Sequence, residues 1–389
     1  MTVNRTWCEV NSTALAANID VLKGHLRPGI MVAPTVKGGA YGHGIPLAAR
    51  AFIDGGAQWL CVDSLDEARV VRDHGIDVPI HVTGYVPLDD LAEAAALDLR
   101  LIVYTRETID RLAALDVEAR VHLKLETGNH RQGVCGEEAL DLADRVRRAP
   151  HLTLEGVSSH FANIEDTTDH SYARSQLARF EAEIAALEAA GHTFEMRHLS
   201  NSAATLLWAG QKLEMVRVGI AAYGLWPSRE TRVATLLTGQ TPLALTPALT
   251  WKTRIAQVKW VPEGAYIGYG CTHRTTHRTR LAILPVGYYD GYDRGLSNMA
   301  HVLIGGRRAP VRGRVCMNIT MVDVTHIPDV HLEQEVVLLG RQGDEVITAS
   351  MLADWAGTIH YEMITRIADH VPRVDCPEDL SGVGDRGPA

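Results

Sequence analysis

Residues of a reactive or phosphate-binding type fall at the ends of short apolar runs in the first 225 residues of the chain. They are Lys37, Lys124, His160, Ser202, Arg217, Gly219 and Ile220. A lysine amine can condense with an aldehyde, an arginine can face a ring nitrogen, and a glycine lets backbone N–H groups approach a phosphate. One lysine at a strand end is usually only a solvated charge. The whole set together favours a site for a phosphorylated aldehyde cofactor, held by Lys37.

The elements that would position these residues alternate regularly. Eight apolar runs are typical of buried strands and cover residues 30–36, 58–64, 79–85, 99–105, 119–126, 152–161, 194–200 and 214–220. Amphipathic stretches between them, such as 65–75, 106–115 and 176–191, have apolar residues three and four positions apart. Eight strand-then-helix units predict an α/β fold of the (β/α)₈ TIM-barrel type, in which reactive groups lie at the C-terminal ends of the strands. We expect this barrel over residues 1–234.

The pattern changes after about residue 236. Alternating segments with glycine-rich turns follow at 248–262, 281–292, 301–306, 307–324 and 335–340. They predict a smaller, mostly antiparallel β-domain over residues 235–389. Helical patterns occur at 350–357 and 360–373, and residues 381–389 are expected to fray.

Composition narrows the class of protein. The 389 residues are 46% hydrophobic and carry a formal net charge of −9, which suits a two-domain globular protein and offers no basic surface for nucleic acid or an anionic membrane. The sequence contains no run of eighteen apolar residues and no signal-peptide core. Its six cysteines lie far apart without CxxC pairs, so we expect thiols in a reducing cytoplasm and no metal site.

Motifs in both parts of the chain resemble those of the alanine racemases. The segment VKGGAYGHG, residues 36–44, is similar to their lysine signature, in which a strand ends in the cofactor lysine and a tyrosine follows four residues later. Other segments match in order: WCEVNSTALAANI, HLKLETGNHRQGV, GVSSHFAN, SNSAATL, MVRVGIAAYGLWPS, PALTWKTRIAQVKWVPEGAYIGYG, PVGYYDGY, GRVCMNI and HYEMITRI. The resemblance covers nearly the whole chain. It implies a racemase that uses pyridoxal 5'-phosphate, forms D-alanine from L-alanine, and works as a homodimer with active sites shared between subunits.

The resemblance also implies two catalytic bases, Lys37 and Tyr269. Racemisation requires the α-proton to be removed from either face of Cα, so one base must lie on each face. Lys37 would also form the Schiff base with the cofactor, and Tyr269 would come from the partner subunit. Without the resemblance, Tyr269 would be interpreted as a core tyrosine in a glycine-flanked turn.

Arg217 is implied as the partner of the pyridine nitrogen. Because an arginine only donates hydrogen bonds, the ring nitrogen stays an acceptor, and the cofactor becomes a weaker electron sink that favours racemisation over transamination. His160 would support Arg217, or else be a satisfied barrel histidine. The implied phosphate ligands are Tyr41, Ser202, Gly219, Ile220 and Tyr361.

Three residues are implied in substrate binding and one in a modification. Arg131 would meet the substrate carboxylate, helped by the backbone N–H of Met317, and Tyr288 would come from the partner subunit. Lys124 matches a lysine that is carbamylated in many relatives, and the carbamate would orient Arg131 by charge-assisted hydrogen bonds. A plain buried lysine–acid pair is the alternative for Lys124.

The chain departs from the family pattern at several positions, namely Gly38, Gly39, Asn129, His130, Asn163, Tyr289 and Asn318. None removes a catalytic group, but together they leave substrate preference open between alanine, serine and a broader range. Two other functions stay as alternatives. A decarboxylase of basic amino acids would need a glycine-rich phosphate loop and a C-terminal cysteine motif, and a non-catalytic cofactor carrier would be a lone barrel. Racemisation of L-alanine, release of carbon dioxide or no reaction would separate the three.

Overall fold

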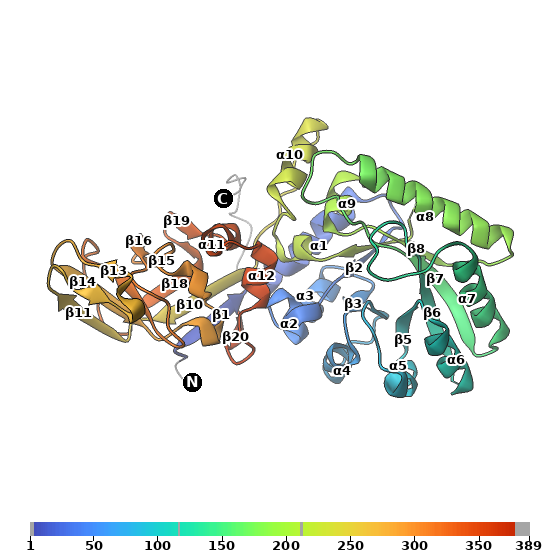
Figure 1. Cartoon of the computed structure of the whole chain (residues 1–389), viewed down its shortest axis with the longest axis horizontal. Helices are drawn as coiled ribbons and strands as arrows, with labels where there is room; N and C mark the ends of the chain where they lie inside the picture. The colour runs from blue at the N-terminus through green and yellow to red at the C-terminus, as the bar shows by residue number, and fades with distance from the viewer. Residues whose placement is uncertain (1–3, 116, 211–212, 378–389) are drawn as a thin grey trace. The chain divides into compact units, whose positions relative to one another are not determined.

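The computed structural model describes residues 4–115, 117–210 and 213–377. It divides the chain into two compact units (Figure 1). The barrel unit comprises residues 13–40 and 45–247, and the β unit comprises residues 1–12, 41–44 and 248–389. The predicted frayed segment, 381–389, lies outside the described residues. Among those residues no helix is long and apolar enough to cross a membrane.

The barrel unit contains eight parallel strands among the described residues. They are β2 (Met31–Pro34), β3 (Leu60–Val62), β4 (Ile80–Val82), β5 (Leu99–Val103), β6 (Ala119–Lys124), β7 (Leu152–Ser158), β8 (Met196–His198) and β9 (Met215–Val218). β3 to β8 form one sheet in chain order, and β2 pairs with β9. A bridge between Thr35 and Cys61 and a 2.9 Å hydrogen bond from Arg217 N to Ser200 O join the two sheets. The predicted α/β barrel is confirmed.

Helices follow the strands of the barrel unit. They are α1 (Ser12–His25), α3 (Ile45–Asp54), α4 (Leu65–Asp73), α5 (Leu91–Ala96), α6 (Arg106–Ala114), α7 (Gly136–Arg148), α8 (Ser171–Ala189), α9 (Ser202–Leu207) and α10 (Arg229–Leu237), with 3₁₀ turns η1 (Leu88–Asp90) and η2 (Ile220–Tyr223). In α4 the buried residues Leu65, Ala68 and Val71 recur every three positions, so one face of the helix packs on the sheet. Figure 1 shows α6, α7 and α8 lying outside the strands that they follow.

The β unit is built from antiparallel sheets. One sheet has the order β16 (Arg307–Pro310), β15 (His301–Ile304), β18 (Glu335–Gln342), β10 (Leu249–Arg254), β1 (Thr6–Val10) and β20 (Arg373–Asp375), with β19 (Glu345–Ile347) beside β18. A second has the order β11 (Gln257–Val261), β14 (Thr279–Leu284) and β17 (Thr320–Asp323), and β12 (Tyr266–Ile267) pairs with β13 (His273–Arg274). The helical segments are η3 (Tyr269–Cys271), η4 (Tyr288–Asp290), η5 (Arg294–Leu296), α11 (Ala349–Ala356) and α12 (His360–Thr365). The parallel pairing of β1 with β20 is an exception to the antiparallel pattern.

The first strand lies in a different unit from the one that the sequence predicted. Residues 1–234 were expected in the barrel, but β1 belongs to the β unit. It pairs antiparallel with β10, so that Cys8 lies opposite Trp251. The division therefore includes the N-terminal strand in the β unit and falls at residue 247, after the predicted boundary at 234.

The predicted strand 248–262 is two strands in two different sheets. At the junction Ile255 N donates to Gln334 O (3.0 Å), whereas Ala256 N donates to Ile283 O (2.8 Å). Ile255 thus bonds to the residue before β18, whereas the next residue, Ala256, bonds to β14. A continuous alternation of apolar and polar residues cannot reveal this change of partner.

Candidate active site

Lys37 lies three residues after the end of β2 and opens the short segment α2 (Lys37–Tyr41). This segment is a left-handed turn, because Gly38, Gly39, Ala40 and Tyr41 have φ between 53° and 62°. Glycine adopts positive φ without a Cβ clash, whereas other residues do so at a cost. From the sequence, Gly38 and Gly39 were only two of the departures that leave substrate preference open. The backbone supplies a reason for both glycines.

The Lys37 amine pairs with an acid that the sequence analysis did not name. Lys37 Nζ lies 3.1 Å from Oδ1 of Asp63, the residue after β3. Glu67 in α4 accepts 2.7 Å hydrogen bonds from the backbone N–H groups of both Gly38 and Asp63. This carboxylate fastens the end of β2 to the end of β3. An acid directly after an apolar run was the available signal for Asp63.

Arg217 lies in β9 and is only 8% exposed. Its Nη2 donates to Ser159 O (2.8 Å) and lies 3.4 Å from His160 Nδ1, and its Nη1 donates to His198 O (3.0 Å) and to His198 Nδ1. Burial lowers the pKa of Arg217 to about 10, so the guanidinium stays charged at neutral pH. Burial and the neighbouring cations Lys124 and Arg217 hold the pKa of His160 well below its usual range. A neutral His160 can therefore accept at Nδ1.

A chain of buried hydrogen bonds continues from Arg217 through the barrel. His198 Nε2 lies 2.6 Å from His122 Nδ1, and His122 Nε2 lies 2.9 Å from Glu155 Oε2. Because an arginine has no acceptor, His198 must accept at Nδ1 and donate from Nε2. His122 must then accept at Nδ1 and donate from Nε2 to Glu155. Every hydrogen bond of this chain, which we call the histidine chain, therefore has a fixed direction.

His81 lies beside the histidine chain, and the nitrogens of His81, His122 and His198 are within 4.8 Å of one another. Three histidines at this spacing could bind a metal ion. Here, however, both ring nitrogens of His122 and of His198 already take part in hydrogen bonds. The buried Arg217 cation beside His198 opposes a second cation. The sequence expectation of no metal site stays a prediction.

Backbone donors converge at the start of α9. Ser202 Oγ accepts hydrogen bonds from Gly219 N (2.9 Å) and Ala221 N (3.3 Å). Asn201 caps α9 by accepting from Ala204 N (3.0 Å), and this hydrogen bond fixes the position of Ser202 as the first helical residue. Gly219 and Ile220 connect β9 to η2. N–H groups gathered on one hydroxyl are a donor set that suits a phosphate.

Lys124 is the last residue of β6 and is 6% exposed. Burial and the charges of Arg217 and Arg131 hold its pKa well below the usual range of a lysine. Arg131 is exposed on the loop after β6, which Glu126 shapes by accepting from Asn129 N (2.8 Å). Two arginines beside a buried lysine favour either a neutral amine or an acquired negative charge.

One departure from the family pattern, His130, lies in the loop before Arg131. His130 has a φ of 52°, in the left-handed region that glycine occupies easily. A glycine at this position would adopt the same φ without a Cβ clash. His130 therefore takes up this left-handed conformation at a cost that a glycine would avoid.

In the β unit, Tyr41 and Tyr361 lie close together. Their ring centroids are 6.2 Å apart. The segment 41–44 packs against α12 so tightly that a Cβ on Gly42 would lie 2.0 Å from Ile364 O. Only a glycine fits there, and this close approach brings the Tyr41 ring to the Tyr361 ring.

The remaining predicted residues are exposed on the β unit. Tyr269 is 74% exposed in η3, so it is not a core tyrosine. Tyr288 and Met317 lie on adjoining segments, since Tyr288 N donates to Cys316 O (3.0 Å) and Tyr289 N donates to Met317 O (2.9 Å). The structure thus gathers the predicted residues into two sets. The barrel unit holds Lys37, Lys124, Arg131, His160, Ser202, Arg217, Gly219 and Ile220, and the β unit holds Tyr41, Tyr269, Tyr288, Met317 and Tyr361.

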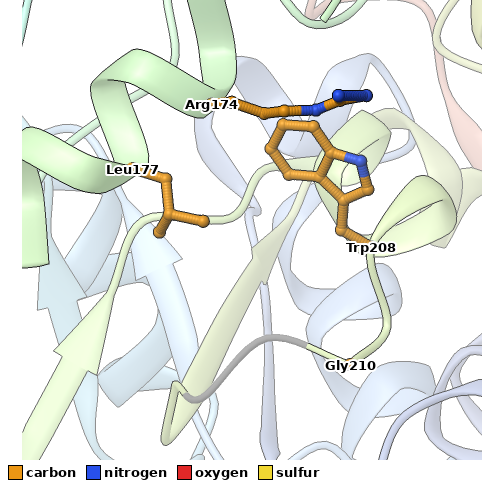
Figure 2. A pocket seen from close by; sticks show the side chains of 4 residues that line it. All are labelled: Arg174, Leu177, Trp208 and Gly210. Carbon is orange, nitrogen blue, oxygen red and sulfur yellow. The ribbon is translucent and has the colours of Figure 1, made fainter. Parts of the chain in front are cut away.

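A separate pocket lies on the barrel unit. It has a volume of about 240 Å³ and is lined by Arg174, Leu177, Trp208 and Gly210 (Figure 2). Figure 2 shows the Arg174 side chain lying along the Trp208 ring. No predicted site residue lines this pocket, so it is distinct from the candidate active site.

Known proteins resemble the chain over nearly its whole length. The alanine racemase N-terminal domain model matches residues 10–227, and the C-terminal domain model matches residues 248–375. An alanine racemase of Symbiobacterium thermophilum is 44% identical over 372 residues, covering 95% of this chain and 96% of that protein. One from Leptospira interrogans is 38% identical over 371 residues, covering 95% of both.

Solved structures agree with these sequence matches. The crystal structure of alanine racemase from Bacillus anthracis with bound L-Ala-P has a TM-score of 0.90 and 36% sequence identity, covering 97% of this chain and 96% of that one. The fold, the site and these relatives define an enzyme of the isomerase class. The chain belongs to the alanine racemase family.

Proposed function

We propose that this enzyme interconverts L-alanine and D-alanine with pyridoxal 5'-phosphate, the cofactor on which its family depends. The observation that carries the proposal is the donor set at the C-terminal ends of the barrel strands. The half-exposed Lys37 amine suits the cofactor aldehyde, and the buried Arg217 suits the ring nitrogen. Ser202, with the N–H groups of Gly219 and Ala221, suits the phosphate.

The bound cofactor supplies an aldehyde carbon for an amine and a ring that takes up the electron pair left when the Cα–H bond breaks. The chain supplies the bases. Lys37 holds the cofactor and, once released from it, removes the α-proton of D-alanine through Nζ. Tyr269 of the partner subunit removes the α-proton of L-alanine on the opposite face. By the resemblance, Tyr41, Tyr361 and Ile220 are proposed as further phosphate ligands.

Arg217 keeps the ring nitrogen an acceptor. Its guanidinium is charged at neutral pH and is held by the carbonyls of Ser159 and His198 and by His198 Nδ1. A charged donor in a fixed position opposes protonation of the atom that it faces. This role would explain why the residue is an arginine, because an unprotonated ring nitrogen favours racemisation over transamination.

Lys124 carries a carbamate in this proposal. The low pKa of its buried amine favours the neutral form, which is the form that adds carbon dioxide. The resulting negative charge would lie near Arg217 and Arg131, whose charges oppose a protonated lysine. It would orient Arg131 towards the substrate carboxylate. Without the modification, a plain buried lysine–acid pair is the alternative for Lys124.

The active unit is a homodimer in this proposal, because Tyr269, Tyr288 and Met317 are exposed on the β unit and would serve the barrel of the other copy. Mixing Lys37→Ala with Tyr269→Ala chains should restore activity, since one site of a mixed dimer keeps both bases. No recovery after verified subunit exchange would contradict shared sites. A cytoplasmic location belongs to the same proposal, since six widely spaced cysteines suit a reducing compartment.

A chiral assay over alanine, serine and lysine tests the function. Alanine should give the largest kcat/KM, serine a smaller one and lysine a negligible one. Discrimination against one extra group in a pocket is about 10- to 200-fold. A larger value for serine would make this a serine racemase, and release of carbon dioxide would make it a decarboxylase. Borohydride reduction should leave the pyridoxyl group on the Lys37 peptide, and a label on another lysine would overturn that assignment.

A further inference from the structure

We propose that Asp63 is a positioning residue for racemisation: it holds the amine of Lys37 whenever that amine is free of the cofactor, and it stabilises the ammonium that forms there. This inference rests on the proposed role of Lys37 as one of the two bases. It adds a residue to the site, because neither the sequence motifs nor the two-base scheme includes an acid at this position.

The geometry places the two groups in direct contact. Lys37 Nζ and Asp63 Oδ1 are 3.1 Å apart, and both side chains are about half exposed, at 45% and 53%. Lysine has a long flexible side chain, which loses rotamer freedom when its amine is held. Asp63, directly after the C-terminal end of the neighbouring strand β3, restricts where the free amine can lie.

Glu67, itself held by Ser64, fixes the position of Asp63. Glu67 accepts from the backbone N–H of Asp63 and from that of Gly38, the residue after Lys37, each at 2.7 Å. The backbone of Asp63 and that of the residue after Lys37 are therefore fixed to one carboxylate. Glu67 itself is fixed in the first turn of α4, where Glu67 N donates to Ser64 Oγ (3.3 Å).

Gly84 leaves room for the Asp63 carboxylate. A Cβ at residue 84 would lie 2.2 Å from Asp63 O and 2.9 Å from Asp63 Oδ2. Gly84 does not have positive φ, so the close approach, and not a turn, requires a glycine there. The next strand end is thus shaped to accommodate this acid.

The chemistry follows from the charge that Lys37 acquires. When the neutral amine removes the α-proton of D-alanine, the Cα–H bond breaks, an N–H bond forms at Nζ, and the electron pair passes to the cofactor. Lys37 becomes an ammonium 3.1 Å from an anion. Asp63 therefore assists proton transfer on the face that Lys37 serves. It has no such role on the face that Tyr269 serves.

The first experiment uses the full chain without cofactor and does not depend on catalysis. Trinitrobenzenesulfonate reacts with neutral amines, and peptide mapping gives the labelling rate of Lys37, with the exposed Lys259 as internal reference. Asp63→Asn should label Lys37 about 1.5- to 5-fold faster than wild type, a range set by the modest strength of exposed ion pairs. Asp66→Asn removes the same charge from the same helix start and should leave the rate unchanged. Equal rates in Asp63→Asn and wild type would overturn the contact.

The second experiment measures exchange of the α-hydrogen with solvent deuterium from each enantiomer in a single turnover of the holoenzyme. Asp63→Asn should slow exchange from D-alanine by a few fold and leave exchange from L-alanine unchanged, whereas Asp66→Asn should change neither. A loss equal for both enantiomers would identify Asp63 as structural only and refute the inference. If the wild-type enzyme exchanged hydrogen from neither enantiomer, the proposed function would be refuted instead. The labelling result would still decide whether Asp63 holds the Lys37 amine.

Discussion

Acid should destabilise the barrel through its buried histidines. Burial, together with neighbouring cations, holds the pKa of His81, His160 and His198 well below the usual 6.5. Each ring stays neutral in the fold but takes up a proton in the unfolded chain. The stability that depends on these neutral rings is therefore complete above pH 6.5. It decreases as the pH falls from 6.5 towards the folded pKa values.

The size of the effect follows from the number of such rings. At pH 5.5, one unit below the unfolded pKa, each neutral histidine lowers the free energy of unfolding by about 1.4 kcal/mol. The three together give about 4 kcal/mol, a large part of the stability of an ordinary domain. Carboxylates contribute little in this window because they titrate at lower pH in the unfolded chain.

Urea unfolding at pH 7.5 and 5.5, at constant ionic strength, measures this loss. The buried Trp59 lies beside these histidines, with its ring centroid 6.0 Å from that of His122. It contributes to a fluorescence signal of the barrel. His81→Leu should reduce the loss by about 1.4 kcal/mol, one ring's share. His74→Gln, at the exposed C-cap of α4, should leave it unchanged. A loss below about 1 kcal/mol in wild type, or an equal loss in His81→Leu, would refute the assignment of neutral rings.

Four further predictions concern single groups. Tyr269→Phe should slow α-hydrogen exchange from L-alanine by about 100-fold or more and leave exchange from D-alanine largely intact, and equal losses would make Tyr269 structural. Gly38→Ala should cost about 1–2 kcal/mol in urea unfolding because of its left-handed φ, whereas Gly24→Ala, in a helix with open space around it, should not destabilise the chain. Enzyme supplied with ¹³C-bicarbonate should show a carbamate carbon signal that Lys124→Arg lacks, and a signal retained in that variant would move the modification elsewhere. Arg217→Glu should slow racemisation and raise pyruvate formation from alanine, and an unchanged product ratio would remove the explanation for the arginine.

The sequence was sufficient to predict the barrel and the site residues that lie at the ends of its strands. Eight apolar runs predicted the barrel, and Lys37, Lys124 and Arg217 lie at or near the ends of the strands as expected. It was insufficient where pairing is distant in the chain. The partner of β1 is a strand about 240 residues later, and an alternating run such as 248–262 does not state which sheet it enters.

Parts of the site were missed for a related reason. His122 and His198 lie within apolar strands, where a polar residue can point either into the barrel or towards the helices, and only the assembled fold decides. Asp63 stands before a helix start, where an acid is ordinary on electrostatic grounds alone. Its contact with Lys37 arises because β2 and β3 are neighbours, which no local pattern encodes.

The fixed direction of the histidine chain has a consequence for proton movement. A proton wire needs each member to accept on one side and donate on the other after its neighbours have reversed, but Arg217 can never accept. His198 therefore cannot reverse, His122 cannot reverse after it, and no proton can pass from Glu155 to the guanidinium. The buried carboxylate and the buried cation are coupled only through oriented dipoles, so the barrel interior insulates Arg217 from the protonation state of the solvent at its far end. Arg217, the proposed partner of the ring nitrogen, therefore neither gains nor loses a proton through the histidine chain.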